Sequence, residues 1–173
     1  MNKKGFCCLF LLVVLIAVSS RVYGQYDSDK GKRSLDFDLS RAQLFFGTLL
    51  PYSTQSATVH MQVTSPGPPP SINYTQSGNI LWQYNQATVA EIRVKSSGGN
   101  NINLFSISIP QKNINLTSGS AYLQLKLDNP VPDHFSSLKK TYQSFYVGGE
   151  LSVNNTKPGG TYTGYYNVVF NYY

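Results

Sequence analysis

Cysteine is scarce in this chain of 173 residues and is confined to one place. The two cysteines, Cys7 and Cys8, both lie in an apolar stretch at the N-terminus. If that stretch is removed on export, the remaining chain has no thiol. This excludes a cysteine nucleophile, a thiolate metal site and stabilising disulfides. A domain of this size buries enough surface to fold without a disulfide.

Histidine and acidic residues are also few, with two histidines and eight Asp and Glu together. His60 alternates with Val59 and Met61, so we expect its side chain on the solvent side of a strand. No nucleophile elbow, phosphate-binding glycine loop or His-Glu-x-x-His motif occurs in the sequence. The carboxylates at four positions show no spacing typical of an acid–base pair: Glu91, Asp128, Asp133 and Glu150. The sequence therefore predicts a protein that is not an enzyme and that carries no cofactor and no metal.

Charge and long apolar runs are limited as well. Charged residues make up 13% of the chain, and the cations cluster only at 30–33 and at Lys139 and Lys140. Such scattered charge is not typical of a nucleic-acid-binding protein. Beyond the N-terminus no run approaches the ~20 apolar residues of a membrane-spanning helix. We therefore expect no nucleic-acid partner and no transmembrane anchor, and we exclude a multi-domain enzyme and a coiled coil.

The first 24 residues have the layout of a secretory signal peptide. Lys3 and Lys4 precede an apolar run over 6–18, and Gly24 offers a small residue before a cleavage point at Gln25. The alternative is a membrane anchor, but the run is short and no stop-transfer pattern follows it. The sequence thus predicts export, with the periplasm, the cell surface or the extracellular space as destination.

The chain after the signal peptide is dominated by a period of two. Residues 25–34 are polar and predict a flexible N-terminal tail. From Leu35 onward, apolar and polar residues alternate, which places one set of side chains on a core face. The alternating segments are 35–39, 57–63, 88–94, 105–109, 121–127 and 166–172. We therefore expect one all-β domain over 35–173, a sandwich in preference to a barrel.

Turn residues separate the expected strands. The proline-rich run 65–70 cannot continue a sheet, because proline lacks the backbone donor. Residues 97–101 predict a hairpin connection, and 129–132 and 157–160 predict further turns. Only 133–142 could hold a turn of helix.

Four short motifs resemble a known family. They are Phe46-Gly47-Thr48, the run 147–153 (VGGELSV), the run 160–164 (GTYTG) and the run 168–172 (VVFNY). Together they resemble the bacterial secreted family called domain of unknown function 4402. That family is similar to spore-coat-U-like proteins and chaperone–usher pilin subunits. The resemblance implies an immunoglobulin-like, pilin-like antiparallel β-sandwich.

The resemblance to pilins also implies a set of assembly residues. Pilin subunits carry a glycine ahead of an alternating last strand that ends on a penultimate aromatic residue. The matching positions here are Gly160, Tyr166, Val168, Phe170 and Tyr172. An N-terminal strand that fills a neighbour's open edge would be formed by Leu35, Phe37 and Leu39. The alternative is that 35–39 is the first strand of a closed, self-sufficient domain.

The sequence predicts two alternative functions. The first is an exported, non-enzymatic structural or adhesion protein, a subunit of a fimbria-like surface assembly. Its partners would be identical or related subunits joined by strand addition, together with a periplasmic chaperone. The alternative is a monomeric secreted module that binds a carbohydrate or another surface component, because tyrosine rings make good contact surfaces. The aromatic residues available for such a patch are Tyr74, Trp82, Tyr84, Tyr142, Tyr146, Tyr162 and Tyr165.

Overall fold

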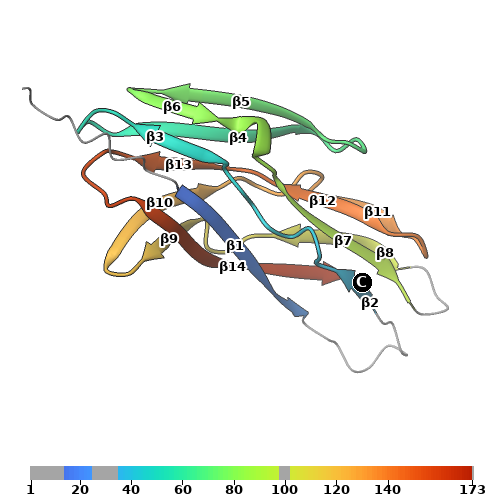
Figure 1. Ribbon diagram of the computed structural model, residues 1–173. Helices are drawn as coiled ribbons and strands as arrows, with labels where there is room; N and C mark the ends of the chain where they lie inside the picture. The colour runs from blue at the N-terminus through green and yellow to red at the C-terminus, as the bar shows by residue number, and fades with distance from the viewer. Residues whose placement is uncertain (1–13, 25–34, 98–101, 173) are drawn as a thin grey trace, which may run out of the picture.

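Strands make up almost all of the regular structure in the computed structural model, which describes residues 14–24, 35–97 and 102–172 (Figure 1). The expected tail at 25–34 and the first thirteen residues of the expected signal peptide lie outside the described residues. The described strands are β1 (Val14–Gly24), β2 (Leu35–Asp38), β3 (Thr48–Pro51), β4 (Ala57–Ser65), β5 (Ser71–Ser77), β6 (Ile80–Gln83), β7 (Ala90–Ser96), β8 (Ile102–Ser108), β9 (Asn113–Ser118), β10 (Ala121–Leu127), β11 (His134–Leu138), β12 (Gln143–Val147), β13 (Gly149–Val153) and β14 (Gly160–Tyr172). Over the described ranges, no helix is long and apolar enough to cross a membrane.

The expected all-β class is confirmed. Each of the six alternating segments lies largely on a strand, and in β4 the residues Ala57, Val59 and Met61 are fully buried, as the alternation predicts. The expected helical turn within 133–142 is wrong, because β11 pairs there with β8. A strand partner decides the conformation of such a weakly patterned segment. A turn of 3-10 helix lies instead at Tyr84–Gln86.

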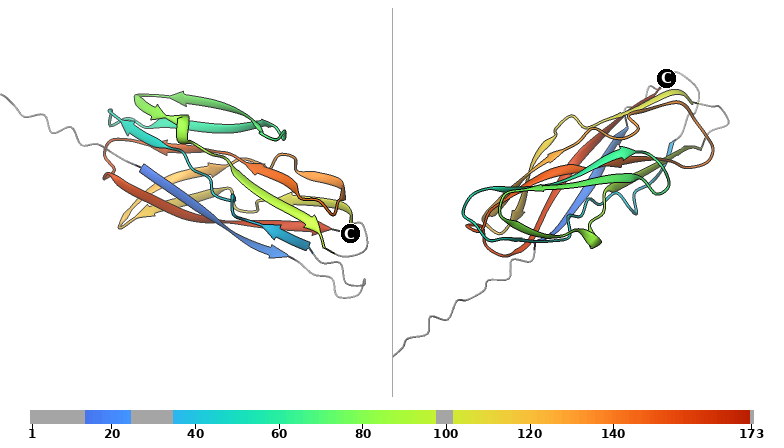
Figure 2. Two further views of the ribbon diagram at one scale, coloured as in Figure 1. Left: turned by 45° about the vertical axis from the view of Figure 1, so that its right-hand side comes forward. Right: turned by 90° about the horizontal axis from the view of Figure 1, so that it is seen from above.

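The described strands form three sheets. The largest is antiparallel in the order β11-β8-β14-β9-β10-β13-β4-β5, with β1 added in parallel to β14. A second sheet has the order β12-β7-β2, and β3 pairs with β6 in a third. Figure 2 shows an elongated molecule in which most strands run roughly along the long axis. Strands far apart in the sequence are thus neighbours, and β2 near one end of the chain lies close to β14 near the other.

The expected hairpin at 97–101 is wrong, although the expected break at 65–70 is confirmed. Residues 98–101 lie outside the described residues, but the flanking strands do not pair with each other, because β7 belongs to the three-stranded sheet and β8 to the largest sheet. Glycine and asparagine predict a change of direction, but they do not decide whether the flanking strands pair. The proline-rich run does separate two strands, since β4 and β5 pair with each other on either side of it.

Aromatic side chains join the sheets through the core. The ring of Phe37 on β2 lies 4.7 Å from that of Phe170 on β14. The ring of Phe105 on β8 lies 5.7 Å from that of Phe145 on β12. Both pairs link the three-stranded sheet to the largest one at separations favoured by interacting aromatic rings. Part of the core therefore lies between these two sheets, and it continues to the third sheet through Leu49, Ile80 and Trp82.

Candidate functional site

Strand β14 has neighbours on both of its hydrogen-bonding edges. Thr163 is paired with Ala17 of β1 and also with Thr117 of β9, so β1 and β9 must lie on opposite edges. Strand β8 continues on the β9 side, from Val169 to Tyr172. The other edge is covered by β1 alone among the described strands, in parallel register over eleven positions. Since β1 belongs to the expected signal peptide, its removal would leave this edge without a partner.

The side chains of β14 alternate between core and surface. The expected assembly residues Tyr166, Val168 and Phe170 are almost completely buried, and Tyr162 continues the same row. Tyr166 also donates a hydrogen bond from its hydroxyl to the Ala42 carbonyl, at 3.2 Å. These side chains thus fix β14 in the core of its own domain. Gly160 and Tyr172 are the first and last residues of β14.

Close packing between β14 and β9 depends on Gly164. A Cβ atom at this position would lie 2.7 Å from Leu116 Cδ2 and 3.2 Å from the Asn115 carbonyl oxygen. Only glycine leaves enough room there for the two backbones to approach. Gly164 was not among the expected assembly residues, although it belongs to the glycine-rich motif at 160–164.

The expected donor segment lies within the chain's own structure. Leu35 and Phe37 are in β2, which pairs antiparallel with β7. Both side chains are half-buried against the core, and Leu39, just beyond the strand, is 36% exposed. The structure therefore places these residues where the closed-domain alternative expects them, and it places β1 along β14. Nothing in the sequence of β1 distinguishes such a strand from the apolar run of a signal peptide.

The aromatic residues considered for a binding patch lie in several places. Tyr74, Trp82 and Tyr84 form one cluster, with ring centroids 5.1 to 5.7 Å apart. Tyr84 is exposed, whereas the Trp82 ring is buried and donates a hydrogen bond to the Phe46 carbonyl at 2.6 Å. The remaining four do not join this cluster: Tyr146 and Tyr162 are buried, Tyr165 is exposed on β14, and Tyr142 immediately precedes β12.

Charged side chains line the outer face of the three-stranded sheet. Lys95 Nζ lies 3.0 Å from Asp36 Oδ2 and 4.6 Å from the centroid of the Tyr142 ring. The hydrogen bond from Lys95 lowers the pKa of Asp36, and a hydrogen bond from the Tyr142 hydroxyl acts in the same direction. In turn, Asp36 raises the pKa of Lys95. Lys95 and Asp36, on the neighbouring strands β7 and β2, thus favour each other's charged forms.

A second ion pair continues this face. Arg93 donates a hydrogen bond to Asp38 Oδ2 at 2.7 Å. The pKa of Asp38 is lowered, chiefly by hydrogen bonds from the hydroxyl and the backbone N–H of Ser40 and also by Arg93. Cross-strand pairs of opposite charge favour the register between β2 and β7.

The two histidines each contact a carboxylate. His60 Nε2 lies 2.9 Å from Asp128 Oδ2, and His134 Nδ1 lies 2.6 Å from Asp133 Oδ1. His60 is half-exposed between the buried Val59 and Met61, as the alternation predicts. Within the described ranges, no three residues among His, Cys, Asp and Glu are grouped so that they could hold a metal ion.

Comparison with known proteins gives one match. The profile of a family described as "Domain of unknown function (DUF4402)" matches residues 38–172. Neither the curated proteins nor the solved structures contain a significant match.

Proposed function

The chain belongs to the family of the domain of unknown function 4402, and from this starting point we propose that it is an exported, non-enzymatic structural or adhesion protein. It assembles with identical or related subunits by strand addition at the edge of β14, in a fimbria-like surface assembly. Its layered sheets are immunoglobulin-like and similar to those of pilin subunits. The periplasm, the cell surface and the extracellular space are its proposed locations, and a periplasmic chaperone is a further proposed partner.

The edge of β14 that is covered by β1 carries the proposal. Cleavage after Gly24 removes β1 and uncovers eleven consecutive backbone positions of the longest strand in the described structure. A long unpaired edge offers a row of N–H and C=O groups to any extended segment. Backbone hydrogen bonds from such a segment give affinity, and its alternating side chains give specificity. The observed pairing with β1 supports the view that this edge accepts an added strand.

The test compares three purified chains by light scattering over a range of concentrations. We expect the chain from Gln25 onward to form oligomers whose mass grows with concentration. A chain that begins at Val14 keeps the covering strand, so we expect it to be monomeric. The matched control is that longer chain with Val18→Pro and Val22→Pro, because proline cannot be accommodated in a paired strand. We expect this control to form oligomers again.

A monomeric chain from Gln25 onward, at every concentration tested, would exclude strand addition. Oligomers of equal mass from all three chains would show that the chain assembles through another surface.

The proposed donor is the segment that contains Leu35, Phe37 and Leu39, which leaves β7 of its own subunit and pairs with β14 of the next one. Changing Leu35 or Phe37 would disturb the core, so the donor is better tested by cross-linking. A chain without its signal peptide has no cysteine of its own. We expect Leu39→Cys and Asn167→Cys chains, when mixed, to form a disulfide-linked dimer of the two variants. Leu39→Cys mixed with Gln76→Cys, which is exposed on β5 at the far end of the sheet from β14, serves as the control and should give none.

A further inference from the structure

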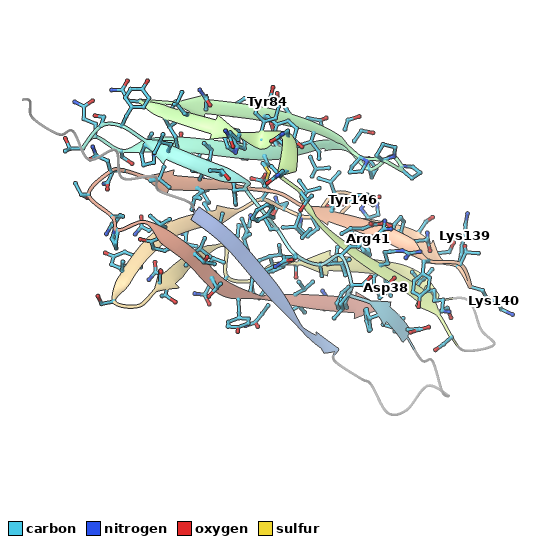
Figure 3. All side chains as sticks on the ribbon, viewed as in Figure 1. Asp38, Arg41, Tyr84, Lys139, Lys140 and Tyr146 are labelled. Atoms are coloured by element: carbon cyan, nitrogen blue, oxygen red, sulfur yellow. The ribbon has the colours of Figure 1, made fainter. Side chains whose placement is uncertain are left out.

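A cleft of about 410 Å³ opens on the outer side of β7 and β12. Its walls come from four separate parts of the chain: the connection after β2, the start of β5, the connection before β7 together with the start of β7, and β12. The residues that carry the argument are Arg41, Ile72, Val89, Glu91 and Tyr146. In Figure 3 the labelled Arg41 and Tyr146 lie close to each other beside these strands. The volume is within the range of roughly 300–1,000 Å³ that is typical of small-molecule sites.

Tyr146 contributes a buried hydroxyl that lacks a partner. Its neighbour Phe145 packs in the core against Phe105, so alternation places Tyr146 on the opposite face of β12, beside Glu91 of β7. Tyr146 is only 4% exposed, and its hydroxyl makes no hydrogen bond to any group in the described part of the chain. Buried hydroxyls are almost always hydrogen-bonded. A molecule in the cleft could supply the missing bond.

Glu91 and Arg41 supply a charge pair whose net charge is zero. Glu91 accepts a hydrogen bond from Arg41 Nη1 at 3.3 Å through Oε2, and one from the Ser144 hydroxyl at 2.7 Å through Oε1. The side chain of Glu91 is 16% exposed and that of Arg41 is 71% exposed. Because the charges compensate each other, the cleft does not favour an anion or a cation. The guanidinium still has N–H groups to donate, and each carboxylate oxygen can accept a further bond.

We propose that this cleft binds a neutral saccharide unit. A sugar hydroxyl both donates and accepts, so it can satisfy the Tyr146 hydroxyl, the Glu91 carboxylate and the Arg41 guanidinium together. The C–H face of the sugar ring suits the apolar wall that includes Ile72 and Val89. Tyrosine itself presents an apolar ring and a polar tip to such a ligand. This site lies on the three-stranded sheet and does not depend on strand addition at β14.

The test is calorimetric titration of the exported protein with methyl glycosides of glucose, galactose, mannose, N-acetylglucosamine and N-acetylgalactosamine. Glucosamine and glucuronic acid serve as charged probes. We expect at least one neutral glycoside to bind with a Kd on the order of 1 mM, which is typical of a small polar ligand in an open site. We expect the charged sugars to bind at least about tenfold more weakly.

The decisive variant is Tyr146→Phe, which removes only the unpartnered hydroxyl. We expect it to weaken binding about tenfold or more, because polar groups of the ligand then lose a partner. Tyr142→Phe makes the same change just before the start of the same strand, outside the cleft, and should leave the Kd unchanged. Glu91→Gln should also weaken binding.

Thermal unfolding without sugar tests whether the Tyr146 hydroxyl has only a structural role. Removing an unsatisfied buried hydroxyl should leave Tm unchanged or raise it slightly. A fall in Tm of several degrees for Tyr146→Phe would show that the hydroxyl is satisfied within the fold. That result, an equal Kd for the two Tyr→Phe variants, or no binding of any neutral glycoside would overturn the proposal.

Discussion

Asp36 accepts two side-chain hydrogen bonds on the outer face of the three-stranded sheet. Its carboxylate accepts hydrogen bonds from Lys95 on the adjacent strand β7 and from Tyr142, which immediately precedes β12. Both contacts lower its pKa in the folded state. Because the carboxylate is exposed, solvent screens these contacts, and their contribution to stability is small and sensitive to salt.

The direction of this pKa shift predicts how stability depends on pH. A carboxyl whose pKa is lower in the folded state stabilises the protein above its unfolded pKa of about 3.9. This contribution is lost as the pH falls through the lower, folded value. We therefore expect the free energy of unfolding to decrease below about pH 4, and Asp36→Asn to make that decrease shallower. Urea denaturation at a series of pH values measures both.

High salt provides the control for this prediction. In about 1 M NaCl the charges are screened, so the chain with and without Asp36→Asn should show nearly the same pH dependence. If the free energy of unfolding of Asp36→Asn falls as steeply below about pH 4 at low salt as that of the original chain, the assigned role of Asp36 is wrong.

Strand β14 depends on a glycine where it approaches β9. A side chain at Gly164 would meet Leu116, which is fully buried and has little room to move. We expect Gly164→Val to lower the free energy of unfolding by about 1–3 kcal/mol, as overpacking of a core does. Thermal and urea unfolding of the purified variant measure this loss.

Gly119, in the turn between β9 and β10, is the matched control for Gly164. A Cβ atom there would meet nothing within 4 Å, and its φ of +58° is one that asparagine tolerates. We expect Gly119→Asn to change the stability by less than about 0.5 kcal/mol. If both variants lose the same free energy of unfolding, close packing against β9 is not the reason that Gly164→Val is destabilising.

Aromatic contacts between the two larger sheets stabilise the whole domain. Phe37 and Phe170 come from strands near opposite ends of the sequence, and their rings meet between the two larger sheets. In a double-mutant cycle with Phe37→Leu and Phe170→Leu, we expect a coupling energy of about 0.5–1.5 kcal/mol, the usual range for an aromatic pair. Chemical denaturation of the four chains gives this value.

Phe145 provides a comparison for that cycle. Its ring contacts are with Phe105 and Phe135. Phe37→Leu combined with Phe145→Leu should therefore be additive, within about 0.5 kcal/mol. A coupling energy between Phe37 and Phe145 as large as that between Phe37 and Phe170 would show that the coupling does not depend on direct ring contact.

Local alternation predicted the strands that bury one face, but it missed strands that depend on their neighbours. β4 and β10 were predictable because apolar residues occupy every second position. β5 has no fully buried residue, and its conformation follows from pairing with β4, which no local pattern reveals. The pairing of β1 with β14 is equally non-local.

The cleft could not have been predicted from the sequence. Arg41, Ile72, Glu91 and Tyr146 are widely separated in the chain, and no motif connects them. The sequence identified Tyr146 only as one aromatic residue among seven. Its importance arises from the fold, which buries its hydroxyl beside a charged pair.

The parallel pairing of β1 with β14 also has a pharmacological consequence if the proposed function holds. The uncovered edge spans about 36 Å at the roughly 3.3 Å per residue of a parallel strand, so a compact drug molecule would cover only a fraction of it. A peptide with the sequence of Val14–Gly24 already has the matching length and register. Under the proposed function, this segment is therefore a starting template for an inhibitor that covers the edge of β14 and blocks strand addition.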